Sequence, residues 1–133
     1  MRYDLGRFMF MRTEFLIAGM LLLVPSAWAQ TNKGYYRSPA IHGDTVVFTS
    51  EGDLWEAGIS GGLARRLTTH PGSETNAAFS PDGKTIAFSA AYEGPTEVYT
   101  MPASGGLPQR HTFDGVGATV VGWTPDGKLI YST

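Results

Sequence analysis

The sequence predicts an all-β fold built from repeated four-stranded units, and three observations support this prediction. The chain contains 17 Gly and 8 Pro among its 133 residues, many of them in turn-like clusters, which favours short strands over helices. Segments with alternating apolar residues follow turn sequences such as "SPDG" at 80–83, as expected for strands joined by tight turns. Similar segments recur at an offset of about 44 residues, and a period of this length indicates a repeat architecture.

The repeat is clearest around two similar turns. The segment "FSPDGKTIAFSA" (79–90) matches "WTPDGKLIYST" (123–133), and a weaker copy, "IHGDTVVFTS", spans 41–50. The segments between them also align, because "DLWEAGISGGLARRLT" (53–68) lies over "EVYTMPASGGLPQRHT" (97–112) at an offset of 44. The chain therefore holds about two and a third copies of one unit.

Each unit is expected to contain four antiparallel strands. In the second unit these are 75–80, 85–90, 97–102 and 107–113, with turns at "SPDG" and "ASGG". Four such strands in about 44 residues correspond to one blade of a β-propeller, so the predicted fold is a partial β-propeller. The residues expected to pack against neighbouring blades are Phe79, Ile86, Phe88, Val98 and Tyr99 in the second unit, and Val46, Phe48, Leu54 and Trp55 in the first.

The first 29 residues predict a cleaved secretory signal peptide. A positive region with Arg2, Arg7 and Arg12 precedes the apolar run "FLIAGMLLLV" at 15–24. As a helix these ten residues would span about 15 Å, half of a hydrocarbon core of about 30 Å. Small residues in A-x-A spacing follow and end at Ala29, which is typical of a signal-peptidase site.

Two domains are therefore expected, a signal peptide at 1–29 and an incomplete N-terminal part of a propeller at 30–133. Export to the periplasm or the extracellular space follows from this division. A membrane anchor or a buried core helix is the alternative interpretation of the apolar run. The start codon is left open between Met1, Met9 and Met11.

A candidate nucleophile, Ser60, lies in "GISGG" (58–62), which matches the G-x-S-x-G elbow of serine hydrolases. The equivalent segment of the next unit, "PASGG", places Pro102 where an elbow needs its first glycine, and it carries Ser104 at the matching position. A strand, and not the helix of an elbow, is expected to follow Ser60. The pattern is thus interpreted as a repeated turn, and no catalytic residue is predicted in this chain.

Other polar residues are weighed in the same way. His42, His70 and His111 are unevenly spaced and are interpreted as loop or strand-end histidines, so no metal site is predicted. Asp53 and Glu97 align with each other just ahead of an aromatic residue. The repeat favours a role at the start of a strand over acid–base catalysis.

Arginines at Arg65, Arg66 and Arg110 fall on the predicted outer strands. A charged edge that discourages pairing with another sheet is favoured over an anion site. The chain has no Cys, which excludes disulfides, thiolate metal ligands and Cys nucleophiles. Its formal net charge of −2 does not indicate a nucleic-acid partner, and no cofactor is expected.

Two family resemblances follow from these motifs. The "SPDGKTIAFSA" and "TPDGKLIYST" segments resemble the P-D-G repeats of TolB-like propellers. The segment "SPAIHGDTVVFTSEGDLWEA" (38–57) resembles the opening of the tricorn-type proteases, whose first propeller begins with a similar Ile-His-Gly-Asp and Asp-Leu-Trp pattern. The resemblance covers about residues 35–133 and indicates the fold more strongly than the activity.

The tricorn resemblance implies a large serine peptidase in which propellers precede a PDZ-like domain and the catalytic domains. The propellers would admit or filter a peptide or protein substrate, and the catalytic Ser and His would lie in the later domains. No position of this chain matches them. A homo-oligomer is left open, and an exported bacterial relative is favoured over the cytosolic members. The alternatives are a TolB-like interaction propeller of the cell envelope and the propeller of a prolyl-oligopeptidase-like enzyme.

Expressed in a bacterium, the product is expected to be cut between Ala29 and Gln30, because signal peptidase requires small residues in this spacing. Measuring the intact mass of the exported product checks the site. Replacing Ala29 by Tyr is expected to block the cut and serves as the control. An exported wild-type product that still carries residues 15–24 would contradict the prediction and favour the anchor.

Overall fold

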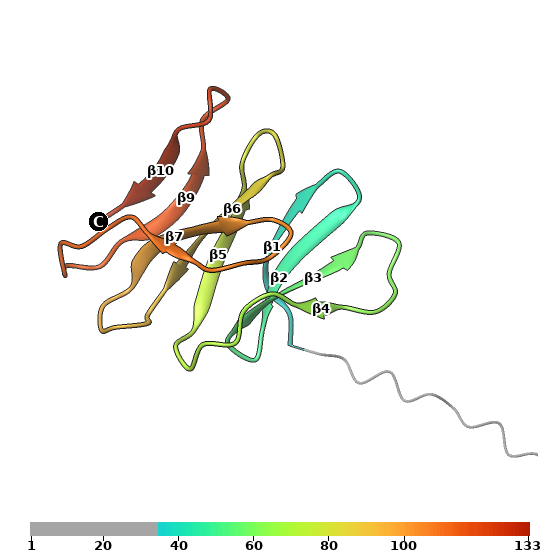
Figure 1. The fold of residues 1–133 in the computed structure, drawn as a ribbon, viewed down its shortest axis with the longest axis horizontal. Coiled ribbons are helices and arrows are strands. Elements are labelled where there is room, and N and C mark those ends of the chain that lie inside the picture. The colour runs from blue at the N-terminus through green and yellow to red at the C-terminus, as the bar shows by residue number, and fades with distance from the viewer. Residues whose placement is uncertain (1–34) are drawn as a thin grey trace, which may run out of the picture. The chain divides into compact units, whose positions relative to one another are not determined.

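The computed structural model describes residues 35–133, and all ten regular elements in this range are β-strands (Figure 1). The predicted signal peptide, residues 1–29, lies outside the described residues. In residues 35–133 there is no helix with the length and hydropathy needed to cross a membrane. The all-β prediction is confirmed for this part of the chain.

The strands form two four-stranded antiparallel sheets and one two-stranded sheet, each in chain order. The first sheet consists of β1 (Arg37–His42), β2 (Thr45–Ser50), β3 (Asp53–Gly58) and β4 (Arg65–Arg66). The second consists of β5 (Glu74–Phe79), β6 (Thr85–Ala90), β7 (Glu97–Pro102) and β8 (Gln109–Arg110). The third pairs β9 (Thr119–Trp123) with β10 (Leu129–Ser132).

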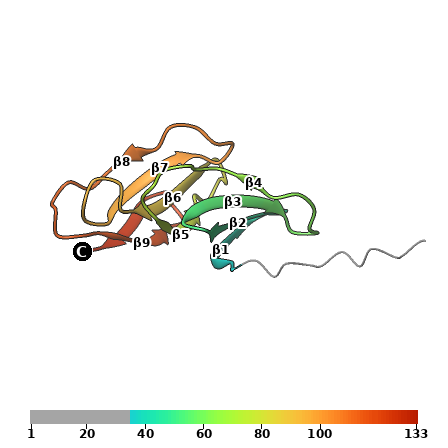
Figure 2. The ribbon, with the colours of Figure 1, turned by 90° about the horizontal axis from the view of Figure 1, so that it is seen from below.

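The sheets follow one another as propeller blades do. Figure 2 shows the first strands β1, β5 and β9 along one edge and the last strands β4 and β8 along the opposite edge. The residues of β1 lie next to those of β5, and the residues of β5 lie next to those of β9. The predicted blade of four consecutive strands is therefore confirmed for the first two units.

The fourth strand is shorter than predicted. The sequence predicted a strand over 107–113, whereas β8 contains only Gln109 and Arg110. Gly105 and Gly106 before it have φ of 91° and 150°, which is not strand geometry, and Pro108 has no N–H to donate to a ladder. Local backbone chemistry therefore limits the length of the outer strand.

The second sheet is covered on both faces, which confirms most of its predicted core. Ile86 and Phe88 are buried in one cluster with Val47 and Leu54 of the first sheet. On the opposite face, Ala87 and Val98 are buried with residues of the third sheet, including Val120. The split follows from the alternation of side chains along a strand.

The predicted core of the first sheet is partly wrong. Val47 and Thr49 are fully buried against the second sheet, whereas Val46 and Phe48 are only half-buried. Strand alternation places Phe48, together with its cross-strand partner Trp55, on the other face of the sheet. That face has no neighbouring sheet within residues 35–133, and the Phe48 ring meets Tyr36 edge-on at 5.0 Å between centroids. The sequence shows that apolar residues alternate along the strand, but it does not show which face of the sheet packs against a neighbouring sheet.

A close contact joins the turns of the first two blades. Gly83, in the turn between β5 and β6, has φ of +69°, and a Cβ atom at this position would overlap the ring of His42. The His42 ring also lies 5.7 Å from the ring of Phe79. His42, predicted to be a solvated turn histidine, is exposed and yet packs on the next blade.

Gly83→Ala is expected to destabilise the protein more than Gly43→Ala. Gly43 occupies the equivalent turn with φ of +55° and nothing within 4 Å of an added Cβ. Left-handed backbone costs Ala about 1–2 kcal/mol at either position, and displacing His42 adds about 1 kcal/mol at Gly83. Urea denaturation compares them. His42→Ala should remove the excess, and equal losses in both single variants would exclude the packing role.

Candidate functional site

A carboxylate, an arginine and a threonine, called the triad, occupy equivalent positions at the outer side of each complete blade, and the threonine bonds to its own carboxylate in the second blade. In the first blade, Asp53 opens β3 and pairs with Arg66 of β4. Thr68 follows β4, and its Oγ1 accepts a hydrogen bond from the Leu54 N–H at 2.8 Å. Asp53 is only 3% exposed, so the arginine supplies the charge that a buried carboxylate requires.

The second blade repeats this arrangement with Glu97, Arg110 and Thr112. Arg110 Nη2 lies 3.0 Å from Glu97 Oε1, and Thr112 Oγ1 accepts from the Val98 N–H at 2.9 Å. Thr112 donates its hydroxyl to Glu97. These are the positions that the sequence aligned, and the structure places Asp53 and Glu97 at the first residue of the third strand. The triads fasten the short outer strand to its neighbour.

Glu74 has no counterpart in the repeat. It is fully buried at the first residue of β5, and Ala118 holds the equivalent place in the third unit. Thr68 Oγ1 donates to Glu74 Oε2 at 2.8 Å, and the Tyr92 hydroxyl donates to Oε1 at 2.7 Å. The interface between the first two blades thus contains a polar bridge, whereas Thr112 of the second blade turns to its own Glu97.

The environments of the two buried glutamates shift their pKa values in opposite directions. Burial raises the pKa of Glu74 above its usual value, although hydrogen bonds from Tyr92 and Thr68 act against the shift. Burial and the adjacent Glu74 raise the pKa of the Tyr92 hydroxyl. The hydrogen bond from Thr112 and the nearby Arg110 lower the pKa of Glu97.

Tyr92 comes from an insertion that interrupts the repeat. Residues 91–96 join β6 to β7, whereas only residues 51–52 join β2 to β3. The longer connection brings Tyr92 against His70, with ring centroids 3.9 Å apart. His70 Nδ1 accepts a hydrogen bond from the Gly72 N–H at 3.0 Å, so the neutral imidazole carries its proton on Nε2.

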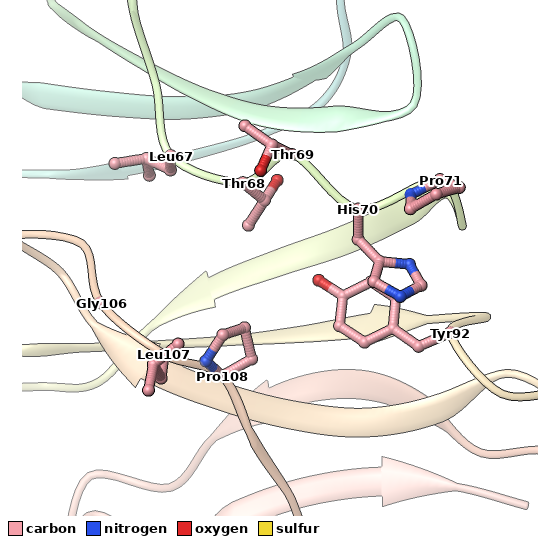
Figure 3. A pocket seen from close by; sticks show the side chains of 9 residues that line it. All are labelled: Leu67, Thr68, Thr69, His70, Pro71, Tyr92, Gly106, Leu107 and Pro108. Atoms are coloured by element: carbon pink, nitrogen blue, oxygen red, sulfur yellow. The ribbon is translucent and has the colours of Figure 1, made fainter.

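A shallow pocket of about 300 Å³ opens beside this aromatic pair, between segments of the two blades (Figure 3). Its lining residues are Leu67, Thr68, Thr69, His70, Pro71, Tyr92, Gly106, Leu107 and Pro108. Leu107 is 92% exposed. The leucine and proline side chains of the lining suit contact with an apolar side chain.

Sequence reasoning missed this pocket. His70 was interpreted as a loop histidine, and Tyr92 was not singled out. A signal was present, because the offset between the first two units changes from 40 at Phe48 and Phe88 to 44 at Trp55 and Tyr99. That change marks the insertion, although not the surface that it builds.

The candidate serines lie in equivalent tight turns between the third and fourth strands. The Gly61 N–H donates to the Gly58 carbonyl at 2.9 Å, and the Gly105 N–H donates to the Pro102 carbonyl at 2.9 Å. The segment after Ser60 leads into β4 and not into a helix, as the turn interpretation predicted.

The remaining candidates are placed as follows. Arg65 reaches Glu56 Oε1 at 2.8 Å and the Ser104 carbonyl of the next blade at 3.2 Å, so it bridges two blades. His111 Nε2 lies 2.7 Å from Thr100 Oγ1. Among the described residues, no group of three His, Asp or Glu side chains is arranged to hold a metal ion.

Consecutive four-stranded blades with a repeated triad define the class of this protein as a β-propeller. The family described as "Tricorn protease N-terminal beta propeller domain" matches residues 33–133. The chain belongs to this family, and the predicted resemblance to the tricorn-type proteases is confirmed.

Relatives and solved structures agree with this assignment. Tricorn protease homolog 1 of Streptomyces coelicolor is 37% identical over 68 residues, which cover 51% of this chain and 6% of the relative. Tricorn protease of Thermoplasma acidophilum is 42% identical over 50 residues, covering 38% and 5%. The crystal structure of the tricorn protease superposes with a TM-score of 0.67 at 32% identity, covering 75% of this chain and 11% of that one.

A TolB structure is also similar. Putative TolB from Agrobacterium tumefaciens matches with a TM-score of 0.66 and 28% identity, covering 74% of this chain and 38% of that one. The predicted TolB-like character of the repeats is therefore confirmed. The matches span about one-twentieth of the length of the tricorn relatives.

The two buried glutamates are expected to change stability with pH in opposite directions. A raised folded-state pKa means that the contribution of Glu74 is present at low pH and is lost as the pH rises through that pKa. The lowered pKa of Glu97 makes its contribution present above the unfolded-state pKa and lost as the pH falls. Relative to the wild type, Glu74→Gln should therefore gain stability as the pH rises above about 4.5, whereas Glu97→Gln should lose stability as the pH rises from about 2 to about 5.

Urea denaturation at a series of pH values measures both trends. Glu51→Gln is the control, because Glu51 is exposed in the turn between β2 and β3. Parallel pH curves for the wild type, Glu74→Gln and Glu97→Gln would show that neither carboxyl is linked to folding.

Proposed function

We propose that this chain is the N-terminal propeller region of an exported tricorn-like serine peptidase and contacts peptide substrates on their way to proteolysis. The family match over residues 33–133 carries the proposal. The relatives are named tricorn proteases, and catalytic domains that follow the propeller would supply the reaction.

Within this proposal the role of the chain is binding or gating. Its buried carboxylates are engaged by arginine, threonine and tyrosine side chains that fasten strands and blades. Its two candidate serines occupy repeated turns. The signal peptide predicted at residues 1–29 supports the assignment to the periplasm or the extracellular space. The partners would be a peptide or protein substrate and the downstream propeller, PDZ-like and catalytic domains.

A second candidate function is a TolB-like interaction propeller of the cell envelope. The similarity to the TolB structure from Agrobacterium tumefaciens favours it. The two functions predict different partners, because a peptidase propeller should bind unfolded peptides, whereas an interaction module should bind a folded envelope protein. Comparing the binding of a casein digest with that of intact envelope proteins distinguishes them.

The chain alone is expected to hydrolyse no peptide, because Ser60 lies in a turn and no triad partner was found in register with it. Incubation with fluorescein-labelled casein and with ester substrates checks this. Ser104→Ala is the matched control for Ser60→Ala, since the two serines occupy equivalent turns. Turnover that is lost in Ser60→Ala and kept in Ser104→Ala would assign a nucleophile to this chain.

A further inference from the structure

The connection between the first two blades forms one wall of the pocket beside Tyr92. Residues 67–71 line that pocket, and residues 69–73 are called the strap. The strap lies against the insertion at 91–96, because a Cβ atom added to Gly72 would overlap the Ala91 carbonyl. The Ala91 N–H also donates to the Ser73 carbonyl at 3.3 Å. The strap therefore depends on close contacts with the insertion for its position.

His70 holds the strap through two contacts. Its Nδ1 accepts a hydrogen bond from the Gly72 N–H at 3.0 Å, and its ring lies on the ring of Tyr92 (Figure 3), with centroids 3.9 Å apart. The first contact closes a small loop, as an Asn or Asp side chain does when it bonds to the backbone two residues further on. It needs a lone pair on Nδ1, which only the neutral imidazole provides.

Protonation of His70 is incompatible with this contact. An imidazolium carries a hydrogen on both ring nitrogens, so Nδ1–H would face the Gly72 N–H, a second donor. Two donors cannot share one hydrogen bond, and either the ring or the strap has to move. Histidine changes its charge between about pH 5 and pH 8, so the conflict arises in mild acid.

The groups around His70 determine the direction of this movement. The neighbouring pocket is lined by His70, Tyr92, Glu93, Tyr99, Pro108 and Arg110. Glu93 is the exposed carboxylate among them, and Arg110 Nη1 lies 3.3 Å from its Oε2. Arg110 is also paired with the buried Glu97. On the other side of the Tyr92 ring, its hydroxyl donates to Glu74 of β5. An imidazolium is thus attracted to Glu93, whereas Gly72 offers it no acceptor.

We propose that His70 is a pH-sensitive latch, in which the neutral imidazole fixes the strap through Gly72 and the imidazolium releases it. Release loosens one wall of the pocket between the first two blades. Asp114 holds the equivalent place in the connection between β8 and β9, 44 residues further on. The latch is therefore specific to the first interface, where the insertion supplies Tyr92.

Amide hydrogen exchange of the 133-residue chain, measured by NMR at pH 8 and pH 5 and corrected for intrinsic exchange rates, tests the proposal. Protection of the Gly72 amide is expected to fall about fivefold at pH 5, the order of one lost hydrogen bond. The Gly83 amide donates to the Ser80 carbonyl at 2.8 Å and serves as the internal control, since no histidine accepts from it. Equal protection of Gly72 at both pH values would overturn the latch.

Three variants identify the group that titrates. In His70→Asn the side-chain oxygen accepts the Gly72 N–H at either pH, so protection should persist at pH 5. His70→Phe keeps a ring beside Tyr92 without an acceptor, so protection should be low at both pH values. Glu74→Gln should retain the wild-type fall. A fall of equal size in His70→Asn, or its loss in Glu74→Gln, would assign the effect to another group and overturn the proposal. Circular dichroism at both pH values verifies that the variants are folded.

Discussion

Face-to-face packing of consecutive sheets is the constraint on which the rest of this structure depends. The second sheet is buried on both sides, with Ile86 and Phe88 against the first sheet and Ala87 and Val98 against the third. Burying one large apolar side chain contributes about 1.5–3 kcal/mol, and here that contribution exists only when a neighbouring blade is present. Each blade is therefore stabilised largely by the blades beside it.

The packing of the sheets also explains the ion pairs at the outer strands. Once the sheets are stacked, the carboxylates at the start of β3 and β7 are buried, and each needs a cation and hydrogen-bond donors to remain there. Arg66 and Arg110 supply the cations from outer strands of only two residues. The triad thus compensates the burial of charge and fixes the short strand at the same time.

The first interface differs from the second because Glu74 and Tyr92 lie in it. Glu74 is held by hydroxyl groups from Thr68 of one unit and Tyr92 of the next. Tyr92 is available only because the connection between β6 and β7 is longer than its counterpart. A repeat protein can differentiate one interface in this way without changing the blade, since the insertion leaves the strands and their register intact.

The blade could be predicted from the repeated sequence, whereas the pocket could not. The turn at 80–83, the strand order within a blade and the alignment of Asp53 with Glu97 were all available from repetition. The short length of β8 could not be predicted from the repeat, because it depends on the backbone conformation of Gly105 and Gly106. The pocket beside Tyr92 could not be predicted either, because it depends on where an irregular loop lies against another blade.

The order of residues alone established the repeat period, the four-strand unit and the alternation within each strand, because these depend on local chemistry and spacing. It did not establish which face of β2 is buried. Alternation is symmetric, so Phe48 and Val47 were equally suited to a core until a neighbouring sheet covered one of them. Contacts between segments distant in the sequence determine which face of a strand is buried, and no local pattern encodes those contacts.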